Sequence, residues 1–213
     1  MRGIEKEAEP RLLTNYRAAG GKYDGQNFTP VKNSVRLSLL KEQGHLCAYC
    51  MTRITFDDMK VEHWACQAGN SALQLDYSNL LGCCKGGEGE KFVNQTCDSR
   101  KGSQTLKYNP SRPQDRINEI IIYGGQGKIH STDDEFSRQI DAILNLNNAR
   151  LVQNRSLVFD FLRTKLSCKT GKRRTKAELR RLLGELMTVN SQGQLKAYCG
   201  LIENYLLSRL GVN

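Results

Sequence analysis

Six of the eight cysteines in the chain lie between residues 47 and 97. Cys47 and Cys50 form a Cys-x-x-Cys pair, whose two-residue spacer makes a tight turn that lets both thiolates reach one tetrahedral zinc ion. A second pair must come from further along the chain: Cys97 offers one ligand, and Cys83 and Cys84 compete for the other place. A redox-active pair or buried free cysteines are the alternatives. The downstream cysteines favour a zinc site over both.

Between these cysteines, Glu62 and His63 lie side by side in segment 60–64, which alternates apolar and polar residues like a strand. Successive side chains of an extended chain point to opposite faces. The carboxylate can therefore hold a divalent cation while the imidazole takes a proton from water, a combination that suits phosphodiester hydrolysis. Asp98, directly after Cys97, offers a second carboxylate for the same cation. An ordinary hydrogen-bonded histidine is the alternative interpretation of His63 alone.

The elements that must position these residues are short. Residues 45–110 contain most of the cysteines and many glycines, and they indicate short strands, tight loops and one short helix. Ahead of this segment, Thr29 as N-cap and Pro30 at the first helical position predict the start of a helix, and Gly44 predicts its end. Residues 1–28 are polar and glycine-rich, so they predict little regular structure.

The C-terminal part of the chain changes to helical patterns. Residues 120–129 predict a β-hairpin, with two apolar runs around a Gly-Gly-Gln-Gly turn. From about residue 134 onward, apolar side chains recur at helical spacing. Thr175 and Glu178 predict a capping box at the start of one helix, and apolar residues from Leu195 to Leu210 predict the last one. The patterns together predict an α+β protein with a mainly helical C-terminal half.

The chain has 213 residues and a net charge of +10, which favours a polyanionic partner because Lys and Arg neutralise phosphates. No apolar run is long enough for a membrane span, and the first residues lack the apolar stretch of a signal peptide. We therefore expect a cytoplasmic protein without membrane contact, in which clustered cysteines favour metal over disulfides. Residues 163–181 include nine Lys or Arg, either as a solvated surface or as a path for phosphates.

The order of these motifs resembles that of the HNH, or ββα-metal, endonucleases set in a zinc-binding frame: Cys-x-x-Cys, Glu-His, Asn-Leu before a cysteine, and Cys-acid-x-x-Lys. The resemblance implies a ββα-metal module in which His63 is the general base and Asn79 organises the loop. It also implies that Glu62 and Asp98 bind a catalytic Mg²⁺ or Mn²⁺. The family usually has His or Asn where this chain has Asp98, and a carboxylate is a good ligand for Mg²⁺.

The same resemblance favours one of the two adjacent cysteines, because alignment on Asn-Leu-Leu-Gly-x-Cys (residues 79–84) prefers Cys84 over Cys83, although Cys83 stays open as the alternative ligand. The implied structural Zn²⁺ is then held by Cys47, Cys50, Cys84 and Cys97. Twelve residues separate Cys84 from Cys97 where many HNH proteins have two. A glycine-rich insertion of this length can loop out at modest entropic cost.

The chain also resembles the HNH proteins of retron and Septu anti-phage systems. The segments that carry this resemblance are 10–16, 47–50, 61–63, 75–82, 97–102, 108–110, 144–147 and 198–202. The resemblance implies that the protein acts with an ATPase of the ABC/SMC-like class, and that a retron reverse transcriptase with its RNA–DNA product can join them. It also implies a nucleic acid substrate, either DNA or an RNA such as tRNA. We expect Lys101, Arg173 and Arg174 to contact that substrate.

Two functional hypotheses follow from different classes of protein. The first is an endonuclease that hydrolyses phosphodiester bonds as the effector of an anti-phage system. The alternative is a non-catalytic, zinc-framed module that binds nucleic acid or a partner. The combination of Glu62, His63 and Asp98 favours the enzyme, because a pure binding module has no need of it. We divide the chain into an N-terminal extension and helix (1–44), a zinc-framed HNH module (45–112), and a hairpin with a helical region (113–213).

Overall fold

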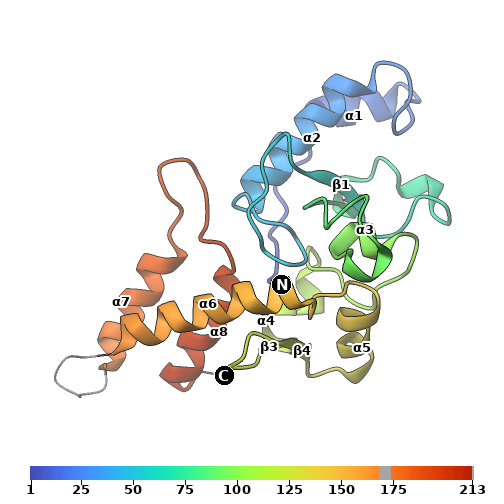
Figure 1. Cartoon of the computed structure of the whole chain (residues 1–213). Helices are drawn as coiled ribbons and strands as arrows, with labels where there is room; N and C mark the ends of the chain where they lie inside the picture. The colour runs from blue at the N-terminus through green and yellow to red at the C-terminus, as the bar shows by residue number, and fades with distance from the viewer. Residues whose placement is uncertain (168–173, 213) are drawn as a thin grey trace.

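Short helices and small strand pairs make up the computed structural model, which describes residues 1–167 and 174–212 (Figure 1). In chain order the elements are α1 (Arg11–Ala18), α2 (Phe28–Glu42), β1 (Lys60–His63), β2 (Leu80–Cys83), α3 (Cys97–Lys101), α4 (Ile117–Ile120), β3 (Ile121–Tyr123), β4 (Ile129–Ser131), α5 (Asp134–Ala142), α6 (Ala149–Leu166), α7 (Lys176–Met187) and α8 (Cys199–Leu210). Four 3-10 turns connect some of them: η1 (Ser71–Leu73), η2 (Tyr77–Asn79), η3 (Phe92–Asn94) and η4 (Pro113–Asp115). The predicted α+β class is confirmed.

Both sheets consist of two antiparallel strands. β1 pairs with β2 in a register that puts Glu62 opposite Leu81 and His63 opposite Leu80. Because side chains alternate along a strand, Glu62 and His63 leave β1 on opposite faces. β3 pairs with β4, which confirms the predicted hairpin. The chain then continues from β2 through a long loop to α3, so β1, β2 and α3 follow one another in sequence.

The helix α2 ends as predicted but starts differently. Asn27, with a left-handed φ of 60°, stands at the N-cap, so the helix begins at Phe28 and Thr29 lies inside its first turn. Gly44 follows the helix end with a φ of 58°. A Cβ at this position would lie 2.6 Å from Cγ of Leu195, so the close approach requires glycine. The helix α1 was not predicted, because we expected little regular structure before residue 29.

The loop that precedes α8 is hydrogen-bonded to both sides of the turn that carries the first two cysteines. The backbone N–H of Leu195 donates to the carbonyl of Gly44 at 3.1 Å, and that of Tyr198 donates to the carbonyl of Met51 at 3.1 Å. The guanidinium of Arg53 also bridges the carbonyls of Gly44 and Leu195. These contacts join the C-terminal half of the chain to that turn.

The helices α6, α7 and α8 gather on one side of the molecule, away from α1 and α2 (Figure 1). The predicted capping box at α7 is confirmed: Oγ1 of Thr175 accepts from the backbone N–H of Glu178 at 3.2 Å, and the Glu178 carboxylate accepts from that of Thr175 at 2.8 Å. The last helix begins at Cys199. Leu195 and Tyr198 were predicted to lie inside this helix, but they precede it.

A single cluster of buried apolar side chains runs through the whole molecule, from Ile4 through Leu39 and Leu81 to Leu210. The three segments that we predicted as separate parts therefore contribute to one core, and their boundaries remain a prediction. In the part of the chain that the structure describes, no helix combines the length and apolar character needed to cross a bilayer.

Candidate functional site

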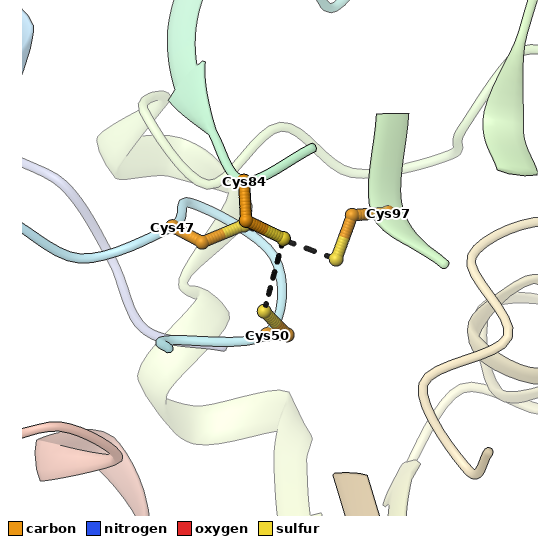
Figure 2. A group of neighbouring side chains, drawn as sticks. All are labelled: Cys47, Cys50, Cys84 and Cys97. Carbon is orange, nitrogen blue, oxygen red and sulfur yellow. Dashed lines mark hydrogen bonds between the residues drawn. The ribbon is translucent and has the colours of Figure 1, made fainter. Parts of the chain in front are cut away.

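Four cysteine sulfurs from three separate segments meet at one point (Figure 2). The Sγ atoms of Cys47, Cys50, Cys84 and Cys97 all lie within 4.8 Å of one another. Sγ of Cys47 lies 3.8 Å from that of Cys97, and Sγ of Cys50 lies 3.7 Å from that of Cys84. Four sulfurs at the usual zinc–sulfur bond length of about 2.3 Å from one ion lie about 3.8 Å apart. The donor set therefore fits a tetrahedral ion such as zinc.

The backbone turns these sulfurs toward one another at both ends of the cluster. Met51 has a φ of 62°, and its N–H donates to the carbonyl of Cys47 at 3.0 Å, which closes the first turn. The N–H of Ala48 donates to the carbonyl of Gly82 at 3.0 Å and so docks that turn on β2. Cys97, with a φ of 56°, begins α3. The cluster thus joins a turn, the end of a strand and the start of a helix.

The charges that the cluster can carry also point to a cation. Burial raises the pKa of Cys47, and hydrogen bonds with the neighbouring sulfurs raise the pKa values of Cys84 and Cys97. Hydrogen bonds from Cys47 and the other cysteines lower the pKa of Cys50. Burial and the crowding of the four sulfurs therefore oppose ionisation of the cluster as a whole. A divalent ion supplies the charge that allows all four to ionise.

Cys83, which precedes Cys84, lies outside the cluster. It is the last residue of β2 and is fully buried, and burial raises its pKa to about 12, so it is a neutral thiol. The Cys83 thiol hydrogen-bonds with Cys47 but does not join the group in which all four sulfurs lie close together, because adjacent side chains of an extended segment point to opposite sides. Cys66 and Cys199 also stand apart from the group. The structure thus brings together the four cysteines selected from the sequence.

Glu62 reaches from β1 toward α3 and is almost completely buried. Its side chain is 5% exposed, and its Oε1 lies 2.7 Å from Nζ of Lys101. The hydroxyl of Tyr49 donates to the same oxygen at 3.0 Å. Burial raises the pKa of Glu62 well above its usual value, and a hydrogen bond with Asp98 acts in the same direction, whereas Lys101 acts against both.

Asp98 directly follows Cys97 on α3 and lies beside Glu62. Its Oδ2 is 2.7 Å from Nζ of Lys60, which also lies 3.1 Å from Oε1 of Glu88. Burial opposes ionisation of Asp98, but hydrogen bonds with Glu62 and Lys60 outweigh it and lower the pKa of this carboxyl. The structure therefore brings the two predicted carboxylates together, each of them paired with one lysine.

His63 leaves β1 on the other face and is also buried, with 6% of its surface exposed. Its Nε2–H donates to the carbonyl of Gln74 at 2.9 Å, and because a carbonyl can only accept, this bond fixes the tautomer. Nδ1 accepts from Nε2 of Gln67 at 3.1 Å. The ring of Tyr23 packs edge-on at 4.5 Å. Burial lowers the pKa of His63, which favours a neutral ring whose Nδ1 lone pair can accept a proton.

Asn79 ties together the loop between β1 and β2. Its Oδ1 accepts from the backbone N–H of Ala65 at 2.8 Å. Its Nδ2 donates to the carbonyls of Ala65 and Leu73 at 3.1 and 3.2 Å. Buried amide groups with this many backbone partners hold a loop in one conformation. The loop held in this way supplies Gln67 and Gln74.

The three basic residues expected at nucleic acid lie in different surroundings. The expectation for Lys101 needs correction, because its side chain is 0% exposed and its ammonium pairs with Glu62 instead of facing solvent. Arg174 pairs with Glu178 at 3.1 Å at the start of α7, on the opposite side of the molecule from β1 and α3 (Figure 1). Arg173 lies outside the described residues.

Sequence reasoning missed a further cation near this site, Arg36 of α2. Its guanidinium has no hydrogen bond or ion pair with any described residue, and its Nε is buried without a partner. It lies 5.7 Å from the ring of Phe56. Tyr23, whose pKa burial raises, is close enough for the charges of Arg36, Asp98 and Glu62 to act on its hydroxyl. No motif or spacing in the sequence marks Arg36.

Two curated relatives match about half of the chain. It is 33% identical over 139 residues to the "Retron Ec83 putative HNH endonuclease" of Escherichia coli, a match that covers 57% of this chain and 54% of the relative. It is also 33% identical over 113 residues to the "Retron Vc95 putative HNH endonuclease" of Vibrio cholerae serotype O1 biovar El Tor, with 49% and 54% covered. The chain spans about half the length of these relatives. No protein-family model matches it.

Proposed function

We propose that this protein is a metal-dependent HNH endonuclease that hydrolyses phosphodiester bonds of nucleic acid. The observation that carries the proposal is the pairing of two adjoining carboxylates, Glu62 and Asp98, with the neighbouring His63 beside a cluster of four cysteines. Similarity to two proteins named as HNH endonucleases of retrons supports the same chemistry. In this proposal β1, β2 and α3 form the ββα-metal module.

His63 suits the role of general base. Its Nε2 is engaged by the Gln74 carbonyl, so Nδ1 is the atom that takes the proton. The amide of Gln67, 3.1 Å from Nδ1, stands where a water molecule would donate during the reaction. A water molecule in the place of the Gln67 amide nitrogen would lie within the range of about 2.6–3.2 Å from Nδ1 that proton transfer requires. Gln67 must therefore swing away before water is activated.

Two metals are part of the proposal. Glu62 and Asp98 would hold a catalytic Mg²⁺ or Mn²⁺, which would stabilise the charge that develops on the phosphoryl oxygens. The four clustered cysteines hold a structural Zn²⁺. Because Cys97 directly precedes Asp98 at the start of α3, the zinc frame fixes the position of one carboxylate of the active site.

We further propose that the protein acts in the cytoplasm as the effector of an anti-phage system. Its partners are an ATPase of the ABC/SMC-like class and a retron reverse transcriptase with its RNA–DNA product. The basis is the resemblance of the motifs together with the two relatives, whose names place them in retrons. The substrate is DNA or an RNA such as tRNA, which the net charge of +10 favours.

Cleavage assays test the proposed activity. Zinc-loaded protein, alone and with the products of neighbouring genes, is incubated with labelled DNA and RNA in Mg²⁺ or Mn²⁺. Cleavage should require the divalent ion and should be lost in Glu62→Gln, which keeps the size of the side chain but removes its charge. The matched variant Glu185→Gln, at an exposed position on α7, should cut like the wild type. Absence of cleavage under every condition would favour the binding-module hypothesis.

A further inference from the structure

Each of the two proposed metal-binding carboxylates already holds an ammonium group. Oε1 of Glu62 lies 2.7 Å from Nζ of Lys101, and Oδ2 of Asp98 lies 2.7 Å from Nζ of Lys60. Little water reaches these pairs: the carboxylate side chains are 5% and 14% exposed. Charges that are removed from water in this way are weakly screened by salt.

The two lysines differ in freedom. Lys101 is completely enclosed, and its Nζ also donates to the backbone carbonyl of His63 at 3.1 Å. The Tyr49 hydroxyl, on the same carboxylate oxygen, further restricts this group. Lys60 is 30% exposed, and its ammonium also reaches Glu88 in the loop before α3 at 3.1 Å. The site therefore contains one fixed cation and one that can turn toward an incoming anion.

We propose that Lys60 and Lys101 make binding of the catalytic divalent cation conditional on binding of a nucleic-acid phosphate. The inference rests on the proposed function and adds a restraint to it. Even with both carboxyl groups ionised, Glu62, Asp98, Lys60 and Lys101 carry no net charge, and the single extra carboxylate, Glu88 on the far side of Lys60, is 57% exposed and screened by water. A divalent cation that enters the free site between Glu62 and Asp98 therefore meets two ammonium groups that are already matched by these two carboxylates.

A phosphate changes this balance. It brings negative charge to the site and offers the partly exposed Lys60 another partner, which frees one oxygen of Asp98. Cation and phosphate then strengthen each other's binding by the same factor, as thermodynamic linkage requires. Without nucleic acid, the site stays poor in divalent cation, so that the free protein is restrained without a separate inhibitory domain.

Binding of Mn²⁺, measured by electron paramagnetic resonance on zinc-loaded His63→Ala protein, tests the inference without cleavage. The titration is made with and without a short DNA or RNA oligonucleotide. Mn²⁺ should bind at least about tenfold more tightly when the oligonucleotide is bound. Adding Lys101→Met, which removes a charge next to Glu62, should tighten Mn²⁺ binding to the free protein about tenfold and reduce the effect of the oligonucleotide.

Two further variants make the test specific. Lys60→Met, at a partly exposed position, should change Mn²⁺ affinity in the same direction, and it replaces Lys101→Met if that variant does not fold. Lys41→Met removes an exposed lysine that pairs with Glu7 at 2.7 Å, and it should leave Mn²⁺ affinity unchanged. Zinc content and melting temperature report whether each variant is folded.

Two results would overturn the inference: Mn²⁺ affinity that is independent of the oligonucleotide, or weaker Mn²⁺ binding in the folded lysine variants. The second result would show that the lysines position the carboxylates and do not oppose the cation. Failure of the proposed function gives a different outcome. In that case Mn²⁺ and oligonucleotide bind cooperatively, but the wild-type protein cuts neither DNA nor RNA.

Discussion

The ring of His63 is held at both nitrogens, by the Gln74 carbonyl and the Gln67 amide. If Nδ1 is the general base, His63→Ala should lower kcat about 10²–10⁴-fold, the usual contribution of general-base catalysis. Zinc content should stay at one ion per chain, because no cysteine ligand is changed. His130→Ala, at an exposed position on β4, is the matched control and should cut at the wild-type rate. Single-turnover cleavage by folded His63→Ala at the wild-type rate would place the base elsewhere.

Arg36 has no hydrogen bond or ion pair with any described residue, its Nε is buried without a partner, and its charge acts on the same Tyr23 hydroxyl as those of Asp98 and Glu62. A substrate phosphate would supply the missing hydrogen bonds. Because a hydrogen bond to a charged group contributes about 1.5–3 kcal/mol, Arg36→Gln should raise KM for nucleic acid about tenfold or more. Arg138→Gln, exposed on α5, should leave KM unchanged. Equal KM values for both variants would show that Arg36 does not contact the substrate.

The sequence predicted those parts of the site whose residues lie close together along the chain, and it missed contacts between distant residues. Cys47 and Cys50, or Glu62 and His63, are close enough for spacing alone to suggest their joint use. Arg36 comes near the site because α2 packs beside β2, which no local pattern encodes. We expected Lys101 to contact nucleic acid, which requires an exposed side chain, as lysines mostly have. Lys101 can be buried because its ammonium pairs with Glu62 on β1.

At the scale of elements, the cysteine cluster joins the turn after α2, the end of β2 and the start of α3. Structural zinc sites contribute about 10–16 kcal/mol, comparable to the whole stability of a domain. Cys84→Ser should therefore release zinc and lower the melting temperature strongly or prevent folding. The adjacent Cys83→Ser should keep one zinc per chain in elemental analysis, because its sulfur lies outside the cluster. Full zinc content and a wild-type melting temperature in Cys84→Ser would refute this ligand set.

The basic residues of α7 allow a test of phosphate binding away from the cysteine cluster. Arg174 is a poor probe, because its reversal would set two negative charges at i and i+4 with Glu178 and weaken the helix start. Arg180 and Arg181 are exposed on the same helix. Changing both to Glu should weaken nucleic-acid binding and lower its logarithmic salt slope by about 2, since each phosphate contact contributes about 0.9. An unchanged slope would identify α7 as a solvated surface.

The elements that sequence analysis predicted correctly are those that depend on local signals. The capping box of α7 and the hairpin of β3 and β4 are set by residues a few positions apart. The helix α1 lacks such a signal, because Leu13 is its only buried residue. A tertiary contact holds it instead: the guanidinium of Arg17 donates to the carbonyl of Leu75 at 2.8 Å. A window of local sequence does not contain this partner.

At the scale of the whole molecule, α6 offers a surface for the proposed ATPase. Leu157 and Phe161, one helical turn apart, are 61% and 40% exposed. Leu157→Glu should reduce co-elution of the chain with the ATPase in size-exclusion chromatography of co-expressed proteins, without a change in melting temperature. Leu37→Glu on α2, at a position 60% exposed, is the matched control. Should the wild-type chain elute alone under several nucleotide conditions, the partnership proposed here is wrong.

The loop before α8 has a mechanical consequence for such an assembly. It is bonded to Gly44 on one side of the first two cysteines and to Met51 on the other. The side chain of Leu195 also packs against Gly44, where a Cβ would lie 2.6 Å from its Cγ. A displacement of the C-terminal helices should therefore move both ends of the turn that carries Cys47 and Cys50. A partner bound to the C-terminal helices would thus be linked to the cysteine cluster through hydrogen-bonded backbone on both sides of the turn.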